Sequence, residues 1–332
     1  MKHANISLFV PHMGCPHQCS FCNQKTISGS IKPLTNEDVF HTLSEAARHN
    51  NDPLNTEIAF FGGSFTAIPR DYMVSLLETA KPFIDKGFFN GIRISTRPDA
   101  IDENILKILK KYSVTAIELG AQSTDEDVLK LNKRGHTRQD IFKASELIKE
   151  NGFSLGLQMM TGLLGDTFEK SLKTGEDIIN IKPDTVRIYP TIVLEGTMLG
   201  AMYKKGEYSP QTTEEAVALC SILLQRFYKN KIKVIRLGLH SGGNVEEGYL
   251  AGPYHPAFGE LCESGVYLNI VKEKLKDIEK GEVTVFVNPR EISKMTGQKG
   301  SNKKKLFEEG YAVTIKDDDS LNKYEIKIQS NI

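Results

Sequence analysis

Three cysteines close together in the sequence have the spacing of ligands to a single metal centre. Cys15, Cys19 and Cys22 follow the pattern C-x3-C-x2-C directly after an apolar segment at 6–10. Thiolates are soft ligands that suit iron–sulfur clusters or zinc, and so short a loop can direct three of them at one centre. Three thiolates on a four-iron cluster leave one iron open, so the motif predicts a 4Fe–4S cluster with a free coordination position.

A structural zinc site is the alternative, with His12 or His17 as its fourth ligand. Such sites usually combine a C-x2-C pair with a second, distant pair of ligands. The two remaining cysteines, Cys220 and Cys262, stand alone, and Cys220 lies on the apolar face of an expected helix. The spacing therefore favours the cluster, and we interpret both histidines as loop residues without a role.

An open iron would give this motif a definite chemistry. S-adenosylmethionine can chelate the iron through its amino and carboxylate groups, and the reduced cluster can then donate an electron into the sulfonium. The resulting 5'-deoxyadenosyl radical abstracts hydrogen from unactivated carbon. Phe21, directly before the last cysteine, would shield the cluster from water. We therefore expect a 4Fe–4S cluster and S-adenosylmethionine as cofactors, with an electron donor such as a flavodoxin or ferredoxin.

Short apolar segments alternate with segments of helical spacing along most of the chain. The apolar segments are rich in β-branched and aromatic residues, which predicts buried strands. These strands are expected at 6–10, 58–61, 92–95, 116–119, 155–159 and 186–189. Several intervening helices open with a Thr-x-x-Asp start signal, at Thr35, Thr124 and Thr137. The alternation predicts an α/β fold in which parallel βα units close partly or completely into a barrel.

Polar and glycine-rich stretches follow directly after these expected strands. They lie at 15–22, 62–66, 95–99, 120–123 and 160–165. In a βα barrel the carboxyl ends of the strands share one mouth, where ligands bind. We therefore expect the cysteines and these stretches to form a single site.

The chain divides by composition into three parts. A barrel core is expected at 1–240, a glycine-rich connecting segment at 241–265 and a small α/β subdomain at 266–332. Lys plus Arg equals Asp plus Glu at 42 each, so any basic site must be local. His240, at the end of the core, is interpreted as a loop residue.

Several classes of protein are disfavoured by composition. No apolar run reaches the roughly 20 residues that a membrane helix needs. The 5 cysteines are an odd number, and the chain does not begin with a basic head joined to an apolar stretch, which argues against a disulfide framework and secretion. We expect a cytoplasmic protein with no membrane partner.

Motifs in a fixed order after the cysteines resemble those of radical S-adenosylmethionine (SAM) enzymes, most closely the radical domain of the catalytic subunit of Elongator. They are Gly-Gly-Ser-Phe-Thr at 62–66, Ser-Thr-Arg-Pro-Asp at 95–99, Glu-Leu-Gly-Ala-Gln-Ser at 118–123, Lys-Arg-Gly-His-Thr at 133–137 and Tyr-Pro-Thr at 189–191. The resemblance covers roughly 5–240. The cysteine spacing is shorter than in Elongator, and we expect its acetyltransferase domain to be absent. Carboxymethylation of the wobble uridine is therefore not carried over to this chain.

The resemblance implies that seven residues contact S-adenosylmethionine. They are Gly62, Gly63, Ser64, Arg97, Gln122, Arg134 and Gln158. The glycine pair would let the backbone approach the methionyl ammonium. Arg134, twelve residues after Gln122, matches the arginine that binds the methionyl carboxylate in related enzymes. Arg97, Gln122 and Gln158 would contact the ribose hydroxyls. Without the resemblance, the glycine pair is an ordinary turn and the two arginines are surface charges.

Arg187 and Tyr189 lie two residues apart on the sixth expected strand and therefore share one of its faces. That face either lines the substrate side of the barrel or packs under the helices. We predict the substrate side and leave the catalytic residues unassigned.

The end of the chain has the element order of a KH module. A strand, a helix, the turn Gly297-Gln298-Lys299-Gly300, a second helix and further strands are expected from 283 onward. Such a turn lets the backbone of a single-stranded nucleic acid pass close to helix termini. The expected RNA contacts are Gly297, Lys299, Gly300, Lys303 and Lys304. The alternative is that the turn only separates two helices and that the lysines are solvated.

These features together predict a radical enzyme that modifies RNA, specifically tRNA. A second hypothesis keeps the radical chemistry and makes the substrate a small metabolite or a peptide. A third, from another class, is a zinc-stapled RNA-binding protein without catalysis. RNA binding by the tail separates the first from the second, and bound iron separates both from the third.

Overall fold

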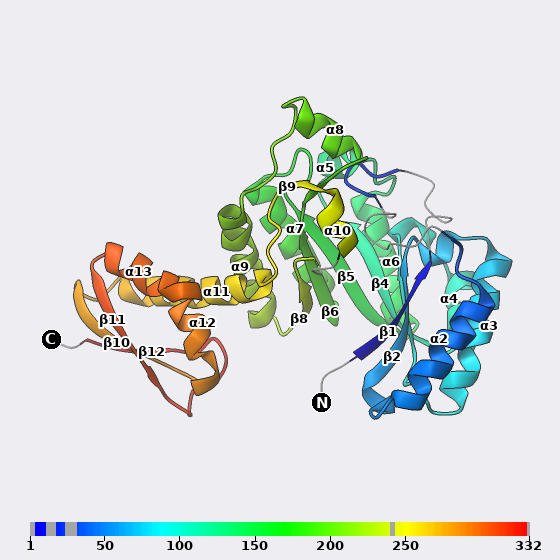
Figure 1. Ribbon diagram of the computed structural model, residues 1–332, viewed down its shortest axis with the longest axis horizontal. Coiled ribbons are helices and arrows are strands. Elements are labelled where there is room, and N and C mark those ends of the chain that lie inside the picture. The colour runs from blue at the N-terminus through cyan, green and yellow to red at the C-terminus, as the bar shows by residue number, and fades with distance from the viewer. Residues whose placement is uncertain (1–3, 11–17, 24–31, 240–242, 331–332) are drawn as a thin grey trace. The chain divides into compact units, whose positions relative to one another are not determined.

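The computed structural model describes residues 4–10, 18–23, 32–239 and 243–330. The chain forms two compact units. The first comprises Met1–Pro210 and Ile232–Gly252, and the second comprises Gln211–Lys231 and Pro253–Ile332. Each unit has its own sheet and its own buried apolar side chains (Figure 1).

The first unit is built on a sheet whose neighbouring strands are all parallel. Its strands, in spatial order, are β1 (Ala4–Val10), β2 (Thr56–Gly62), β3 (Ile92–Thr96), β4 (Val114–Gln122), β5 (Ser154–Thr161), β6 (Thr185–Pro190) and β8 (Lys233–Leu237). No hydrogen bonds join β1 to β8 among the described residues, so the sheet curls but stays open. This confirms the predicted α/β fold in its partial-barrel form.

Helices cover the outer, convex face of this sheet (Figure 1). They are α2 (Asn36–His49), α3 (Arg70–Asp85), α4 (Glu103–Lys111), α5 (Glu126–Leu131), α6 (Arg138–Glu150) and α7 (Phe168–Ile181). The unit also contains α8 (Met198–Lys204), α10 (Gly243–Gly248) and an antiparallel pair of short strands, β7 (Val193–Leu194) and β9 (Tyr249–Ala251).

Threonine side chains begin several of these helices as the sequence predicts. Thr35 and Thr137 each form a capping box with the aspartate three residues later. The start signal expected at Thr124 is wrong. Asp125 caps α5 instead, because its carboxylate accepts a hydrogen bond from the Val128 backbone N at 3.0 Å. The helix therefore begins one residue later than the pattern indicates.

Residues on the two faces of the sheet differ sharply in polarity. The side chains that face the helices are apolar and fully buried, among them Ile58, Phe60, Ile92, Ile94 and Ile117. Burying each such side chain contributes about 1.5–3 kcal/mol. Their sequence neighbours point to the concave side, because successive residues of a strand face opposite ways. Several of these are charged: Glu57, Arg93, Glu118 and Arg187.

The second unit combines a helix pair with a small mixed sheet. Its elements are α9 (Thr213–Lys229), α11 (Phe258–Leu275), β10 (Gly281–Val287), α12 (Ile292–Thr296), α13 (Ser301–Glu308), β11 (Tyr311–Asp317) and β12 (Lys327–Ser330). The central strand β10 is parallel to β11 and antiparallel to β12. The predicted order of strand, helix, Gly-x-x-Gly turn, helix and strand is present. Among the described residues, no helix has the length and apolar composition needed to cross a membrane.

Gly62 ends β2 in a conformation that a side chain would not tolerate. Its φ is +112°, and a Cβ built on it would lie 2.4 Å from the Val10 carbonyl oxygen. That oxygen also accepts a hydrogen bond from the Gly63 backbone N at 2.9 Å, so the two chain segments are fixed in close approach. The packing of β1 against the turn is therefore one reason for glycine at this position.

We expect Gly62→Ala to lower the free energy of unfolding by more than about 3 kcal/mol, because backbone strain and a backbone clash add together. Gly87→Ala is the matched control, since Gly87 has a φ of +75° but nothing within 4 Å of an added Cβ. Strain alone should cost that variant about 1 kcal/mol. Denaturant unfolding of both proteins measures the difference, and equal losses would contradict the clash.

Candidate functional site

The described part of the cysteine loop is tied to the turn that follows α5. The Ser20 hydroxyl donates to Asn132 Oδ1 at 2.6 Å, and the Ser20 backbone N donates to the Asn132 carbonyl at 3.2 Å. Cys19 and Cys22 are half-buried, and the Cys22 backbone N donates to the Cys19 carbonyl at 3.2 Å. The described residues of the loop are thus held against the turn after α5.

The remaining residues of the metal hypothesis, Cys15, His12 and His17, lie outside the described residues, as does His240. Among the residues that are described, no group of three or more His, Cys, Asp or Glu side chains could hold a metal ion. The ligand set of Cys15, Cys19 and Cys22 therefore remains a prediction.

Arg134 brings a positive charge directly to the cysteine loop. Its Nη1 donates to Cys19 Sγ at 3.1 Å, and its Nη2 donates to the Gly120 carbonyl at 2.6 Å. Arg97 supports the same turn, because its Nη2 donates to the Arg134 carbonyl at 3.0 Å while its Nε is paired with Asp99. Arg134 therefore places a positive charge where the thiolate ligands of a cluster would carry negative charge.

Two buried polar atoms near this loop have no hydrogen-bond partner among the described residues. They are Arg134 Nε and Gln122 Oε1. Gln122 also has a φ of +65°, a strained conformation for a residue other than glycine. Unpaired buried polar atoms are costly unless a ligand satisfies them. A donor and an acceptor beside two cysteines therefore fit a polar molecule bound next to a thiolate-held cluster, as S-adenosylmethionine would be.

A network of charged side chains and one amide lies on the concave face of the sheet. We call it the Glu118 network, and it consists of Glu57, Arg93, Glu118, Gln158 and Arg187. Arg187 forms a bidentate pair with Glu118, at 2.7 Å and 2.9 Å. Gln158 Nε2 donates to Glu118 Oε2 at 2.9 Å, and Arg93 Nη1 donates to Glu118 Oε1 at 3.3 Å.

The same network has two carboxylates for its two guanidinium groups. Arg93 also pairs with Glu57, from Nε at 2.8 Å and from Nη2 at 2.7 Å. Glu118 is only 1% exposed. Burial alone would lower the pKa of Arg187, but the hydrogen bonds and charge of Glu118 outweigh it and raise the pKa. Arg187 therefore keeps its charge, and both arginines are neutralised by carboxylates of the protein.

His136 lies under the backbone that carries Gln122. Burial and the nearby charge of Arg134 lower the pKa of His136 to about 4, so the imidazole is neutral near pH 7. Its Nε2 is 3.2 Å from the Ala121 carbonyl oxygen, and Nδ1 has no partner among the described residues. Donation to the carbonyl requires the proton on Nε2, which fixes the tautomer. A neutral imidazole supports the strained turn without adding charge to the site.

The structure divides the predicted contact residues into two groups. Arg97 and Arg134 meet at the cysteine loop, whereas Gln158 and Arg187 belong to the Glu118 network. Arg187 therefore faces the concave side, which was one of two alternatives from the sequence, and Tyr189 contacts it there. Sequence reasoning gave no role to Glu57, Arg93 and Glu118. Their signal was a set of charged residues at alternate positions of strongly apolar strands.

Glu118→Gln should destabilise the protein, because it leaves two buried guanidinium groups with too little negative charge. We expect the free energy of unfolding to fall by about 3 kcal/mol. Asp85→Asn is the control: Asp85 also pairs with a cation, Lys81, but its side chain is 54% exposed. That exposed pair should contribute nothing measurable. Denaturant unfolding of both variants measures the two free energies. If Glu118→Gln and Asp85→Asn lose similar stability, the buried pairing does not stabilise the protein.

Comparison with known proteins gives two family matches. A model of the radical SAM superfamily matches residues 9–178, and a model of the radical SAM C-terminal domain matches residues 183–267. The tRNA uridine(34) acetyltransferase of Methanocaldococcus jannaschii is 40% identical over 131 residues, which cover 39% of this chain and 24% of that protein. Elongator complex protein 3 of Mus musculus is 27% identical over 278 residues, covering 76% of this chain and 50% of that protein.

A solved structure has the same fold. The Methanocaldococcus infernus Elp3 with an N-terminal deletion superposes with a TM-score of 0.64 at 24% identity, covering 83% of this chain and 65% of that one. The chain thus spans between a quarter and a half of the length of these curated relatives. The expected cofactors, a 4Fe–4S cluster and S-adenosylmethionine, are those of the matched family. With family models covering most of its length, the chain belongs to the radical SAM superfamily of enzymes.

Proposed function

We propose that this protein modifies RNA, specifically tRNA, by radical chemistry. The observation that carries the proposal is the 40% identity, over 131 residues, to a relative named as a tRNA uridine(34) acetyltransferase. A basic Gly-x-x-Gly turn in the second unit supports it independently. The atom that is modified and the group that is transferred follow from neither observation.

The first unit would hold the cofactors with residues that have separate tasks. Cys15, Cys19 and Cys22 would bind the cluster, which together with S-adenosylmethionine supplies a carbon radical. Arg134 would compensate the negative charge of the thiolates and, through its unpaired Nε, orient the methionyl carboxylate. An external one-electron donor of the flavodoxin or ferredoxin kind would reduce the cluster.

The other predicted cofactor contacts would lie at the carboxyl edge of the sheet, except Gln158, which lies within β5 on the concave face. They are Gly62, Gly63, Ser64, Arg97, Gln122 and Gln158. Gln158 is held by its amide nitrogen, which donates to Ser95 Oγ at 3.3 Å and to Glu118. Its Oε1 is therefore the atom that would accept a hydrogen bond from a ribose hydroxyl. Gln122 would use its unpaired Oε1 in the same way.

The turn of the second unit uses backbone conformations that favour glycine, and its position is well anchored. Gly297 has a φ of +77°, and a Cβ built there would lie 2.5 Å from Ser301 Oγ. Gly300 has a φ of +76° and open space around it. Buried Asn302 fixes the start of α13, because its Nδ2 donates to the Ser264 carbonyl at 2.9 Å. The amino end of α13 thus faces a turn that a phosphate could approach.

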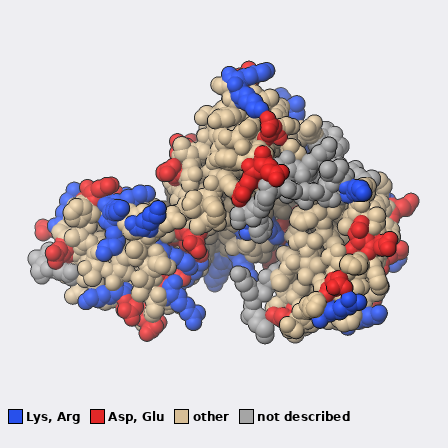
Figure 2. All heavy atoms as spheres, in the orientation of Figure 1, with Lys and Arg blue, Asp and Glu red and all other residues tan. Residues whose placement is uncertain are grey.

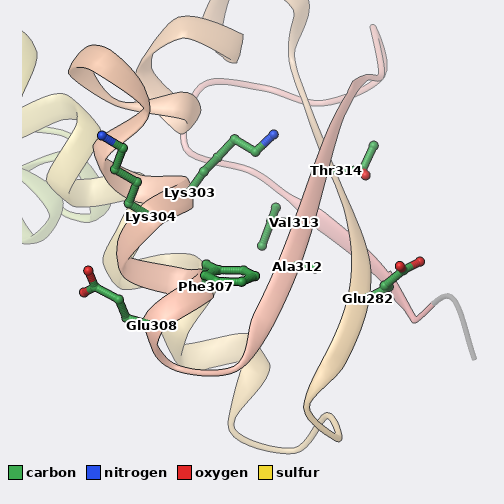
Figure 3. Close-up of a pocket in the computed structure, with 8 residues that line it drawn as sticks. All are labelled: Glu282, Lys303, Lys304, Phe307, Glu308, Ala312, Val313 and Thr314. Atoms are coloured by element: carbon green, nitrogen blue, oxygen red, sulfur yellow. The ribbon is translucent and has the colours of Figure 1, made fainter.

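A groove of about 530 Å³ lies between α13 and the edge strand β11. Lys303 and Lys304 lie at the end nearest the turn, and Glu308 lies toward the other end (Figure 3). Phe307, between them, is 71% exposed. Lys and Arg side chains are interspersed with Asp and Glu on this unit, so the positive charge beside the turn is local (Figure 2). An exposed ring beside lysines suits an RNA base stacked next to its phosphate.

Modification of RNA can be tested by comparing nucleosides in RNA from cells with and without the gene, by mass spectrometry. We expect one modified nucleoside to disappear when the gene is lost and not to return with Cys19→Ala or Cys22→Ala. The same variants should lose iron and reductive formation of 5'-deoxyadenosine under anaerobic conditions. Unchanged RNA together with intact cleavage of S-adenosylmethionine would point to a small metabolite or a peptide. A colourless, zinc-loaded protein would point to the non-catalytic alternative.

RNA binding by the second unit predicts specific losses in the full-length protein. Phe307→Ala should weaken binding of a single-stranded RNA oligonucleotide by about tenfold, since base stacking contributes about 1–3 kcal/mol. Lys299→Asp should weaken it by a similar factor, because it reverses a charge beside the RNA phosphates. Phe40→Ala is the matched control, because Phe40 is 60% exposed in the first unit. Fluorescence anisotropy at several salt concentrations measures the affinities. If Lys299→Asp and Phe307→Ala bind the RNA as tightly as Phe40→Ala and the wild-type protein do, this unit does not take part in RNA recognition.

A further inference from the structure

Three arginines lie on the concave face of the first unit, on strands β3, β6 and β8. Arg93 and Arg187 are neutralised by Glu57 and Glu118, as described above. Arg236 is different: its one side-chain hydrogen bond runs from Nε to the Gly238 carbonyl oxygen, at 2.9 Å. No carboxylate within the described residues pairs with it.

The residues of the first unit that the structure does not describe supply no carboxylate for Arg236 either. The segments 1–3, 11–17, 24–31 and 240–242 contain no aspartate or glutamate. The last segment, 331–332, belongs to the other unit. The first unit therefore has no undescribed acidic side chain that could serve as a partner for Arg236.

The position of Arg236 makes the missing partner significant. Arg236 and Arg187 are register partners on the parallel strands β8 and β6, so their side chains leave the sheet on the same face. Arg236 is half-buried, and burial together with the charge of Arg187 lowers its pKa. Two guanidinium groups side by side with only one adjacent carboxylate leave an excess positive charge in a partly desolvated place. Such a charge is stabilised by an anion from outside the chain.

Tyr189 adds a second donor at the same place. It lies two residues beyond Arg187 toward the carboxyl end of β6 and interacts with both arginines. Burial raises the pKa of its hydroxyl, so the group keeps its proton and can donate a hydrogen bond. A guanidinium and a phenol hydroxyl close enough to interact form a suitable site for an oxyanion.

The site is distinct from the one proposed for the methionyl carboxylate. Arg134 contacts Gly120, which lies on β4, whereas Arg236 lies on β8. The strand order β4, β5, β6, β8 places three strand spacings between them, a path of about 14 Å along the sheet. One small carboxylate cannot satisfy both arginines, so the second anion must come from another part of a bound molecule.

We propose that Arg236, together with the hydroxyl of Tyr189, binds a backbone phosphodiester of the RNA substrate next to the nucleotide that is modified. This inference rests on the proposed function, because RNA supplies a phosphodiester beside every base. The contact holds the target nucleotide against the radical source, and so it acts on positioning more than on overall affinity. Arg187 remains engaged by Glu118 and orients the site without binding the phosphate alone.

The test uses the cluster-loaded full-length protein and an RNA oligonucleotide that spans the modified position. Arg236→Gln should lower kcat/KM for this RNA by about 10- to 100-fold, the loss expected for a charge-assisted hydrogen bond. Arg236→Lys, which keeps the charge but not the fork, should lose less. Lys233→Gln is the control, because it removes one charge at the exposed amino end of the same strand. That variant should stay within twofold of wild type, about the noise of such comparisons.

Neutral methylphosphonate linkages, introduced one at a time into the oligonucleotide, identify the phosphate. With wild-type protein, one linkage near the target should slow modification about as much as Arg236→Gln does. With Arg236→Gln, the same linkage should cause little further loss, since the partner is already gone. If the losses caused by Arg236→Gln and by the methylphosphonate multiply at every linkage, the proposed contact is wrong. It is also wrong if the only change in Arg236→Gln is a raised KM for S-adenosylmethionine. If wild-type protein modifies no RNA, the proposed function fails first and this assignment falls with it.

Discussion

The carboxylate of Glu118 receives hydrogen bonds from side chains on three other strands, and the geometry of the first unit depends on it. Arg93, Gln158 and Arg187 reach it from β3, β5 and β6. A buried guanidinium is tolerated only when an opposite charge is close and the hydrogen bonds are complete. A shift of any of these strands by one residue would turn its member of the network to the other face. The network therefore ties the strand register to the polarity of the concave face, and that face exists before any ligand binds.

This constraint explains how one sheet serves two environments. The convex face is apolar and buried beneath helices, so its contribution to stability grows with the area covered. The concave face carries charges, so its contribution to stability depends on whether every charge has a partner. Removing one partner costs more free energy than the intact pair contributes. The strained backbone at Gly62 and Gln122 lies at the carboxyl edge of the same sheet. A rigid network below such an edge can hold unfavourable backbone conformations in place, which is a common property of ligand-binding sites.

Much of this arrangement could be predicted from local sequence patterns, and the failures have one cause. Apolar segments located the first six expected strands, and the cysteine spacing with the motifs at 62–66 and 118–123 located the site. The partners of Arg187 could not be predicted, because pairing across β4, β5 and β6 depends on strand register, which no single strand encodes. The start of α5 was misplaced for a similar reason: Thr124 turns its backbone N toward Thr174 on a distant helix, and Asp125 is left to cap. A role for Arg236 on β8 could not be predicted either, because it depends on the pairing of β8 with β6.

Each of the two units contains both compensated and uncompensated positive charge. The chain as a whole is neutral, and Arg93, Arg97 and Arg187 are each paired with a carboxylate within the protein. A neutral protein that handles a polyanion cannot rely on its overall field, so it needs a few cations without internal partners at defined places. Arg236 on the concave face and the lysines around the turn at 297–300 are such places. At either place, a phosphodiester of the RNA would supply the negative charge that the protein itself does not.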